Sequence, residues 1–308
     1  KVVAAMEKMT DEPMNSLELK LAGSLGMSVI TEITNPAYDM ESGSTQVNAV
    51  ATADLKAKDL DNENFMMSLI GSFNVQVEHP EESLVESADA EAEFYIADDV
   101  ENNKWLYAKL SGDIGQIVGN PSVSQLKGKV PFDASAMIED LLGVDFDPTL
   151  TEEFADLTEF IEIALGNIDQ VTATSKDGNI EVNYRLTQEA VVNIILDFAL
   201  EMTASEDWPN SQEYEETYTM LNDALTINKA DITIGVDKLG YPNLLDIDLD
   251  IEIESPFYIY VIAGDGMREE QIGSTKTLID FDVKLDLNVN KTLEITLPDD
   301  LDSYYYAM

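Results

Sequence analysis

Three aspartates at alternating positions, Asp246, Asp248 and Asp250, have the D-x-D-x-D spacing of calcium-binding loops. A calcium loop folds back on its ion, so it needs glycine at its sixth position and a bidentate acid at its twelfth. The sixth position counted from Asp246 is Ile251. Side chains on one face of a strand lie roughly 7 Å apart, whereas calcium holds its oxygens at about 2.3–2.6 Å. The stretch LLDIDLDIEIE (Leu244–Glu254) therefore predicts a strand with a solvated acidic face and no metal site.

Two acidic loops offer better geometry for a cation. ADDVENN contains Asp98, Asp99 and Glu101, and GVDFDPTLTEE contains Asp145 and Asp147 near an expected helix start. The same residue types also form turns and helix caps. Turn and cap chemistry is the simpler interpretation, and adventitious calcium binding stays open as the alternative.

Enzymatic chemistry has little support in this sequence. The chain has no cysteine and a single histidine, His79, so a thiol nucleophile is excluded and a Ser-His-Asp triad would have to use that residue. Among the many acids, Asp197 and Glu201 come closest to a buried catalytic carboxylate, but we expect them to form the face of a helix that reaches water. We predict that the protein is not an enzyme and carries no cofactor; a carboxylate-based hydrolase is the weaker alternative.

The composition excludes some partners. The chain has 308 residues, of which 44% are hydrophobic, and 61 Asp and Glu against 17 Lys and Arg give a net charge of −44. A field of this sign repels nucleic acid and anionic lipid headgroups. No window approaches the roughly 18 uninterrupted apolar residues of a spanning helix. We expect membrane contact only through an N-terminal lipid anchor that this sequence does not contain.

Period-two alternation of apolar and polar residues dominates the chain and predicts about ten strands. The alternating segments from which we expect these strands are residues 16–30, 47–55, 67–77, 88–96, 104–110, 171–175, 180–186, 230–236, 244–254, 257–262, 278–289 and 292–297. Asp177-Gly178 is a strong turn signal between two of them, since glycine adopts positive φ without strain. Each strand has one apolar face, so one side of the sheet should be covered by other elements while the other side is exposed to solvent.

Helical periodicity predicts what covers that apolar side. Helices are expected over 133–143, 149–165, 187–204 and 210–225. The helix over 187–204 is apolar around most of its circumference and must be buried on most sides. We therefore predict a single α+β domain over residues 1–308, with a long curved antiparallel sheet and helices on its concave face.

The segment ITIGVDKLGYPNLLDIDLDIEI (Ile232–Ile253) resembles a hairpin of the LolA/LppX-type lipoproteins, in particular of Gram-positive cell-surface lipoproteins in that superfamily. The order of elements along most of the chain is similar to theirs as well. The resemblance implies a half-open barrel whose concave face, lidded by helices, holds acyl chains or other lipids. It further implies an extracellular protein that is secreted or anchored at the cell surface.

These observations together predict binding of a hydrophobic small molecule or lipid between the sheet and the helix around Val191–Met202 by a monomer. The expected lining residues are Leu19, Leu21, Phe73, Val75, Ile195, Phe198, Ile247, Leu249 and Phe281. The same residues could instead form a closed core. The alternative function is then an adhesion or interaction module with a solid core and an acidic outer face. The tyrosine-rich C-terminal end, Tyr304–Tyr306, is either adhesive or simply packed, with terminal disorder as the default expectation.

Overall fold

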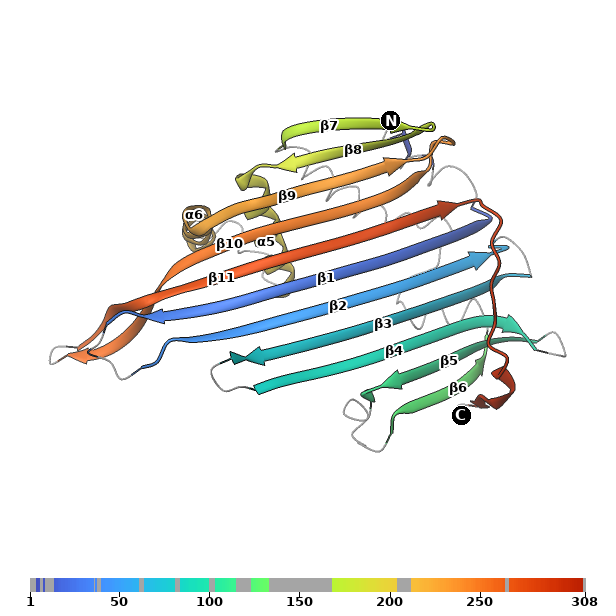
Figure 1. The fold of residues 1–308 in the computed structure, drawn as a ribbon, viewed down its shortest axis with the longest axis horizontal. Coiled ribbons are helices and arrows are strands. Elements are labelled where there is room, and N and C mark those ends of the chain that lie inside the picture. Colours follow the sequence, from blue (N-terminus) through green and yellow to red (C-terminus); the bar gives the residue numbers. More distant parts are fainter. Residues whose placement is uncertain are drawn as a thin grey trace.

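The computed structural model describes residues 4–5, 8, 14–35, 37, 40–60, 64–80, 84–99, 103–114, 123–132, 168–203, 212–263 and 266–306. For the second half of α5 and for the ends of some other elements, only the backbone is described. The helices predicted over 133–143 and 149–165 lie outside the described residues. All the described strands belong to one open sheet (Figure 1).

The sheet has twelve strands in the order β12-β6-β5-β4-β3-β2-β1-β11-β10-β9-β8-β7. Neighbouring strands are antiparallel except for the short β12, which pairs in parallel with β6. The strands are β1 (Ser16–Ile33), β2 (Gly43–Lys58), β3 (Met66–His79), β4 (Leu84–Asp98), β5 (Lys104–Gly112), β6 (Gln125–Pro131), β7 (Ile168–Lys176), β8 (Asn179–Leu186), β9 (Leu225–Val236), β10 (Pro242–Ala263), β11 (Gly266–Val289) and β12 (Tyr305–Tyr306).

Strand lengths and registers follow from the alternation. β10 and β11, of 22 and 24 residues, pair over most of their length, so the aliphatic residues of β10 face those of β11. The predicted strands 244–254 and 257–262 form one strand, β10, with a register irregularity between Phe257 and Tyr258. Asp177 and Gly178 have φ angles of 53° and 88°, as the predicted β7–β8 turn requires.

Two helices, α5 (Gln188–Thr203) and α6 (Gln212–Ala224), confirm the predictions over 187–204 and 210–225. Thr187 caps α5, since its Oγ1 accepts a hydrogen bond from the Ala190 backbone N–H at 3.2 Å. Both helices lie behind the sheet in Figure 1, at the end formed by β8–β11. The predicted fold class, α+β with a curved antiparallel sheet and helices packed on its concave face, is confirmed. No described helix is long and apolar enough to cross a membrane.

The main core lies between these helices and the sheet. Its buried residues include Leu186, Val191, Val192, Leu196, Leu225, Ala230, Ile232, Ile234, Val236 and Ile251. Val192 and Leu196 are 0% and 1% exposed. Most of the apolar side chains in the described part of α5 are therefore buried, as the sequence predicts.

The C-terminal segment corrects two predictions. Residues Thr292–Leu297, expected as a strand, have no regular secondary structure. Instead the chain leaves β11 and passes along the ends of the neighbouring strands to the far edge of the sheet, where β12 pairs with β6 (Figure 1). Tyr304 is thus buried against the sheet and Tyr305 pairs with β6, which agrees with the packed alternative and not with the default expectation of disorder. Strand β6 was also not predicted.

Candidate functional site

The apolar face of the sheet consists of rows of side chains that run across the strands. Three neighbouring rows cover its centre: Leu249, Phe281, Leu25, Ala49, Val75 and Ala88; Ile247, Val283, Gly23, Ala51, Phe73 and Ala90; and Leu245, Leu285, Leu21, Ala53, Gly71 and Ala92. Each row follows directly paired residues from β10 through β11, β1, β2 and β3 to β4. A single alternating pattern in six strands thus produces one continuous apolar surface.

The expected lining residues of the sheet all lie on this face. They are Leu19, Leu21, Phe73, Val75, Ile247, Leu249 and Phe281. Ile195 of α5 packs against the main core together with Ile247 and Leu249. The side chain of Phe198 lies outside the described residues, as do those of Asp197 and Glu201.

The structure brings only part of this set together. Ile195, Ile247 and Leu249 share one cluster, and Phe281 pairs directly with Leu249. Phe73, by contrast, lies on β3, three strands beyond β11. The predicted lining residues therefore belong to two regions of the same face, one beside the helices and one on β1–β3.

The side chains of the two regions are buried to different extents. The helix-covered region has a tightly buried core, with Ile232 and Ile251 at 2% and 4% exposure. On β3, Phe73 is 49% exposed, although its cross-strand partners Ala51 and Ala90 are apolar. An aromatic side chain left half-exposed among small apolar neighbours is a surface that can accept a ligand.

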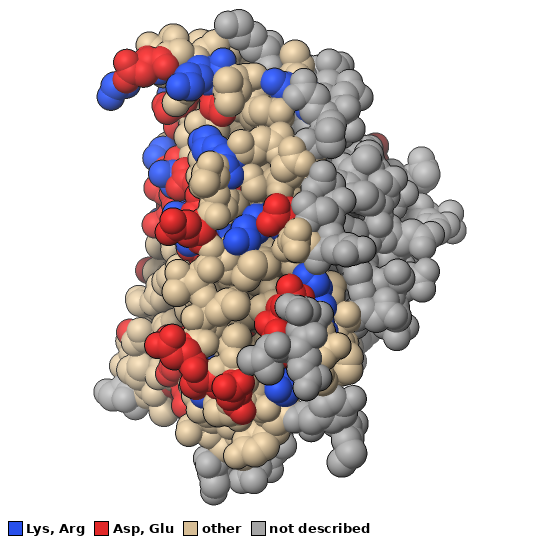
Figure 2. Space-filling view, turned by 90° about the vertical axis from the view of Figure 1, so that its right-hand side faces the viewer, with Lys and Arg blue, Asp and Glu red and all other residues tan. Residues whose placement is uncertain are grey.

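The opposite face of β10 and β11 is acidic, as the LLDIDLDIEIE stretch predicts. Asp248 pairs directly with Asp282, and Asp250 with Asp280. Figure 2 shows charged side chains gathered along one side of the molecule next to a largely uncharged surface. Burial, followed by the charge of Asp282, raises the pKa of Asp246 above its usual value.

No group of three or more acidic or histidine side chains among the described residues has the arrangement of a metal site. In the first acidic loop, Asp99 accepts hydrogen bonds from the Asn103 backbone N–H at 2.9 Å and from Trp105 Nε1 at 2.9 Å. Asp99 thus performs turn chemistry. The second loop, GVDFDPTLTEE, lies outside the described residues. His79, the single histidine, lies at the end of β3 with its Nδ1 3.3 Å from Thr45 Oγ1.

A tyrosine cluster on the polar face at the far end of the sheet was missed from the sequence. Tyr95, Tyr107 and Tyr304 are each 3% exposed, and the rings of Tyr107 and Tyr304 meet edge to face with centroids 5.6 Å apart. The C-terminal segment covers β4 and β5 here. The signal was available, because FYIA (94–97) and WLYA (105–108) are continuous apolar runs, which are typical of strands buried on both faces.

Charges surround this cluster. Burial raises the pKa of Glu93, but hydrogen bonds from Lys109 and Tyr95 outweigh it and hold that pKa below its usual value. Burial raises the pKa of Tyr304 to about 12. The Tyr304 hydroxyl has no hydrogen-bond partner in the described part of the chain.

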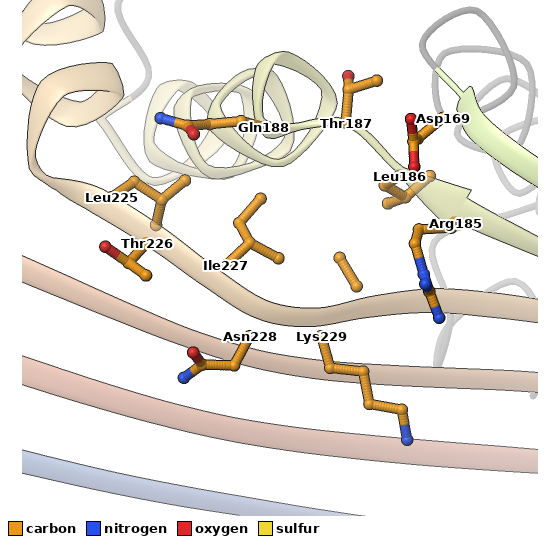
Figure 3. A pocket seen from close by; sticks show the side chains of 11 residues that line it. Asp169, Arg185, Leu186, Thr187, Gln188, Leu225, Thr226, Ile227, Asn228 and Lys229 are labelled. Atoms are coloured by element: carbon orange, nitrogen blue, oxygen red, sulfur yellow. The ribbon is translucent and has the colours of Figure 1, made fainter.

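An open cleft of about 680 Å³ lies where β8 ends and α5 begins. It is lined by Asp169, Arg185, Leu186, Thr187, Gln188, Leu225, Thr226, Ile227, Asn228, Lys229 and Ala230. In Figure 3, Leu225 and Ile227 point toward α5, whereas Arg185 and Lys229 point to the other side of the strand. The cleft thus has an apolar side and a charged side.

Comparisons with known proteins add no family. No protein-family model matches the chain, and no curated protein matches it. Among solved structures, the Salmonella SPI-1 type III secretion injectisome secretin InvG has 7% identity and a TM-score of 0.19, over 96% of this chain and 70% of that one. The transport unit of the autotransporter AIDA-I from Escherichia coli has 8% identity and a TM-score of 0.13, over 93% and 98% of the two chains. These likenesses carry no argument, and the resemblance to LolA/LppX-type lipoproteins stays a prediction.

Proposed function

We propose that the protein binds a hydrophobic ligand, a lipid or an acyl chain, on the apolar face of its sheet. The ligand lies over β1–β4, beside the region that α5 and α6 cover. The observation that carries the proposal is the 49% exposure of Phe73 in the middle of this face. In keeping with the resemblance to LolA/LppX-type lipoproteins, we place the protein outside the cell, secreted or anchored at the surface.

Small neighbours of Phe73 support this placement. Gly23, Ala51 and Ala90 occupy the same row, and Gly71 lies in the next row on β3 itself. These side chains project little from the sheet, so Phe73 is the largest side chain of its row on β1–β4. Four strands span about 14 Å at a spacing of about 4.8 Å, which is enough for several methylene groups to lie across them.

Ligand uptake tests the proposal. We expect a fluorescent fatty acid to bind, with the affinity rising about fourfold per added methylene, since each contributes about 0.8 kcal/mol when it leaves water. Phe73→Asp should weaken binding at least tenfold, because a carboxylate would face the acyl chain. Val50→Asp is the matched control, since Val50 is 48% exposed on the polar face of the neighbouring strand β2.

Native mass spectrometry of the protein from a lipid-rich host gives a second measurement. We expect a co-purified lipid on the parent protein and on Val50→Asp, and its loss from Phe73→Asp. A protein that carries no lipid and takes up no fatty acid of any length would contradict the proposal.

The second candidate function is an interaction module that uses its acidic face. It is favoured by the directly opposed pairs Asp248–Asp282 and Asp250–Asp280, because like charges opposite one another destabilise a sheet. Such a module should bind poly-lysine in a salt-dependent manner, and Asp280→Asn with Asp282→Asn should weaken this binding. Unchanged binding in the double variant would contradict it.

A further inference from the structure

Part of strand β9 lacks a partner strand on one side among the residues that the structure describes, although β9 lies inside the sheet. β8 pairs with β9 only from Ile180–Val236 to Arg185–Asp231, and then turns into α5. The first six residues of β9 are Leu225–Ala230, and all of them except Asn228 pair with β10 on one side. On the other side no described strand accompanies them. This stretch lines the 680 Å³ cleft, and we call it the β9 notch.

Two irregularities open the notch. The β7–β8 register shifts between Ile168 and Gln170, which leaves Asp169 outside the pairing, and the β9–β10 register shifts at Asn228. Both bulged residues line the cleft. Bulges end or redirect pairing, and they recur at positions where a strand edge has a role other than packing.

The notch has the two faces that an added strand requires. Leu186, Leu225 and Ile227 provide apolar contacts on the side of α5 (Figure 3). Thr226, Asn228 and Lys229 are exposed on the other side or at the edge. An incoming segment with alternating side chains would therefore place one set against the aliphatic residues and the other against the polar face.

Charge selects the partner. Around the polar side of the notch, Arg185 is paired with Asp231, and Lys229 with Asp248. Asp169 lines the cleft, and Asp250 accepts a hydrogen bond from the lining residue Asn228, so carboxylates outnumber cations by two in and next to the notch. The chain as a whole carries a net charge of −44. Both the local and the overall field favour a basic segment.

We propose that the β9 notch binds an extended segment of a partner protein, with alternating apolar and basic residues, as an added β-strand. Main-chain hydrogen bonds to Leu225–Ala230 provide the affinity, and the alternate side chains provide the specificity. The proposal does not depend on lipid binding over β1–β4, because the two sites lie on different strands.

A six-residue peptide of alternating lysine and valine, capped at both ends and labelled with fluorescein, is the probe. We expect saturable binding by fluorescence anisotropy at moderate salt. N-methylation of alternate amides should weaken binding at least about tenfold, because it removes main-chain donors and keeps every charge. The same peptide with glutamate in place of lysine should not bind.

Hydrogen exchange locates the peptide. Amides of Leu225–Ala230 should exchange more slowly when the lysine–valine peptide is present, while the amides at the exposed edge β7 stay unchanged. Asp169→Lys should weaken binding about two- to fivefold. Glu91→Lys makes the same charge change at an exposed position on β4 and should have little effect.

Three results would overturn the inference. They are equal binding of the N-methylated peptide, no binding at millimolar peptide, and protection of Leu225–Ala230 that rises with protein concentration alone. The first would indicate charge attraction without strand pairing, and the third would indicate that a second copy of the chain occupies the notch. Fatty-acid uptake measured on the same samples reports on the proposed lipid site over β1–β4. It therefore distinguishes a failure of the peptide-binding inference from a failure of the proposed function.

Discussion

The two halves of the apolar face are built from the same alternating pattern but differ in how they are covered. Over β9 and β10, α5 and α6 bury large aliphatic residues, such as Leu196 and Ile234, to 1% exposure. In the three central rows of the face, β2–β4 contribute mainly alanine and glycine, and Phe73 stays half-exposed. Among the described residues, large side chains occur beneath α5 and α6, and small side chains dominate the central rows where we propose that a ligand binds. The comparison shows that alternation predicts which residues share a face of the sheet, while the size of their side chains indicates what covers that face.

The largest expected effect is a difference in stability between variants of the two halves. Leu196→Ala should lower the free energy of unfolding by about 2–5 kcal/mol, because it opens a cavity in the helix-covered core. Phe73→Ala should cost about 1 kcal/mol, since half of that side chain is already in water. Urea unfolding of both variants measures the difference. Equal losses would show that the two halves are packed alike and would remove the reason to place a ligand on β3.

A second contrast concerns the opposite face, where the C-terminal segment covers β4 and β5. The Tyr95 hydroxyl donates a 2.9 Å hydrogen bond to Glu93 Oε2. The hydroxyl of Tyr304 is buried with no partner among the described residues. Tyr95→Phe should therefore cost about 1.5 kcal/mol, whereas Tyr304→Phe should be neutral or stabilising by up to about 1 kcal/mol. Thermal unfolding of the two variants, which remove the same atom, makes the comparison.

The pH dependence sharpens this contrast. Because the pKa of Glu93 is lowered in the folded protein, its contribution to stability is present above its ordinary value of 4.5 and is lost as the pH falls through the lower folded value. The destabilisation by Tyr95→Phe should shrink over the same range. A loss that is constant from pH 7 to pH 3 would mean that the Tyr95 hydroxyl does not act through the Glu93 carboxylate.

Much of the fold could be predicted because alternation is a local signal. The long strands, the Asp177-Gly178 turn and the helices α5 and α6 follow from patterns within about 20 residues. The two faces of β10 follow from the same kind of pattern. What could not be predicted is how the strands are covered. The passage of the C-terminal segment to β6 depends on contacts such as Tyr304 with Tyr107, which are almost 200 residues apart in the chain.

The candidate site shows the same limit. The sequence identifies which residues of β1, β3, β10 and β11 share a face, because the period of a strand fixes that. It does not identify which of them lie beneath α5, since the distance between Ile195 and Phe73 depends on the order of the strands. The β9 notch depends on two bulges, at Asp169 and Asn228, and no residue pattern in those segments indicates them.

The smallest effect tests whether the acidic face is only a solvated surface. Burial, and then the charge of Asp282, raises the pKa of Asp246, so its ionised form is disfavoured in the folded protein. A raised carboxyl pKa means that the folded state binds more protons than the unfolded state, so ionisation of Asp246 lowers stability above its ordinary value of 3.8. Asp246→Asn should therefore raise the free energy of unfolding at pH 7, by about 0.2–1 kcal/mol, and the gain should vanish near pH 3.

Asp302→Asn is the control, because it removes the same charge from an exposed residue at the far edge of the sheet. If Asp302→Asn stabilises the protein as much as Asp246→Asn does, the gain comes from the lower net charge of the whole chain. If only Asp246→Asn stabilises the protein, the destabilising interaction is the local repulsion among the carboxylates of β10 and β11. Salt should then reduce the difference only in part, because Asp246 is half-buried and its interaction with Asp282 is incompletely screened. The interaction-module hypothesis depends on this local repulsion, because a cationic partner would relieve it.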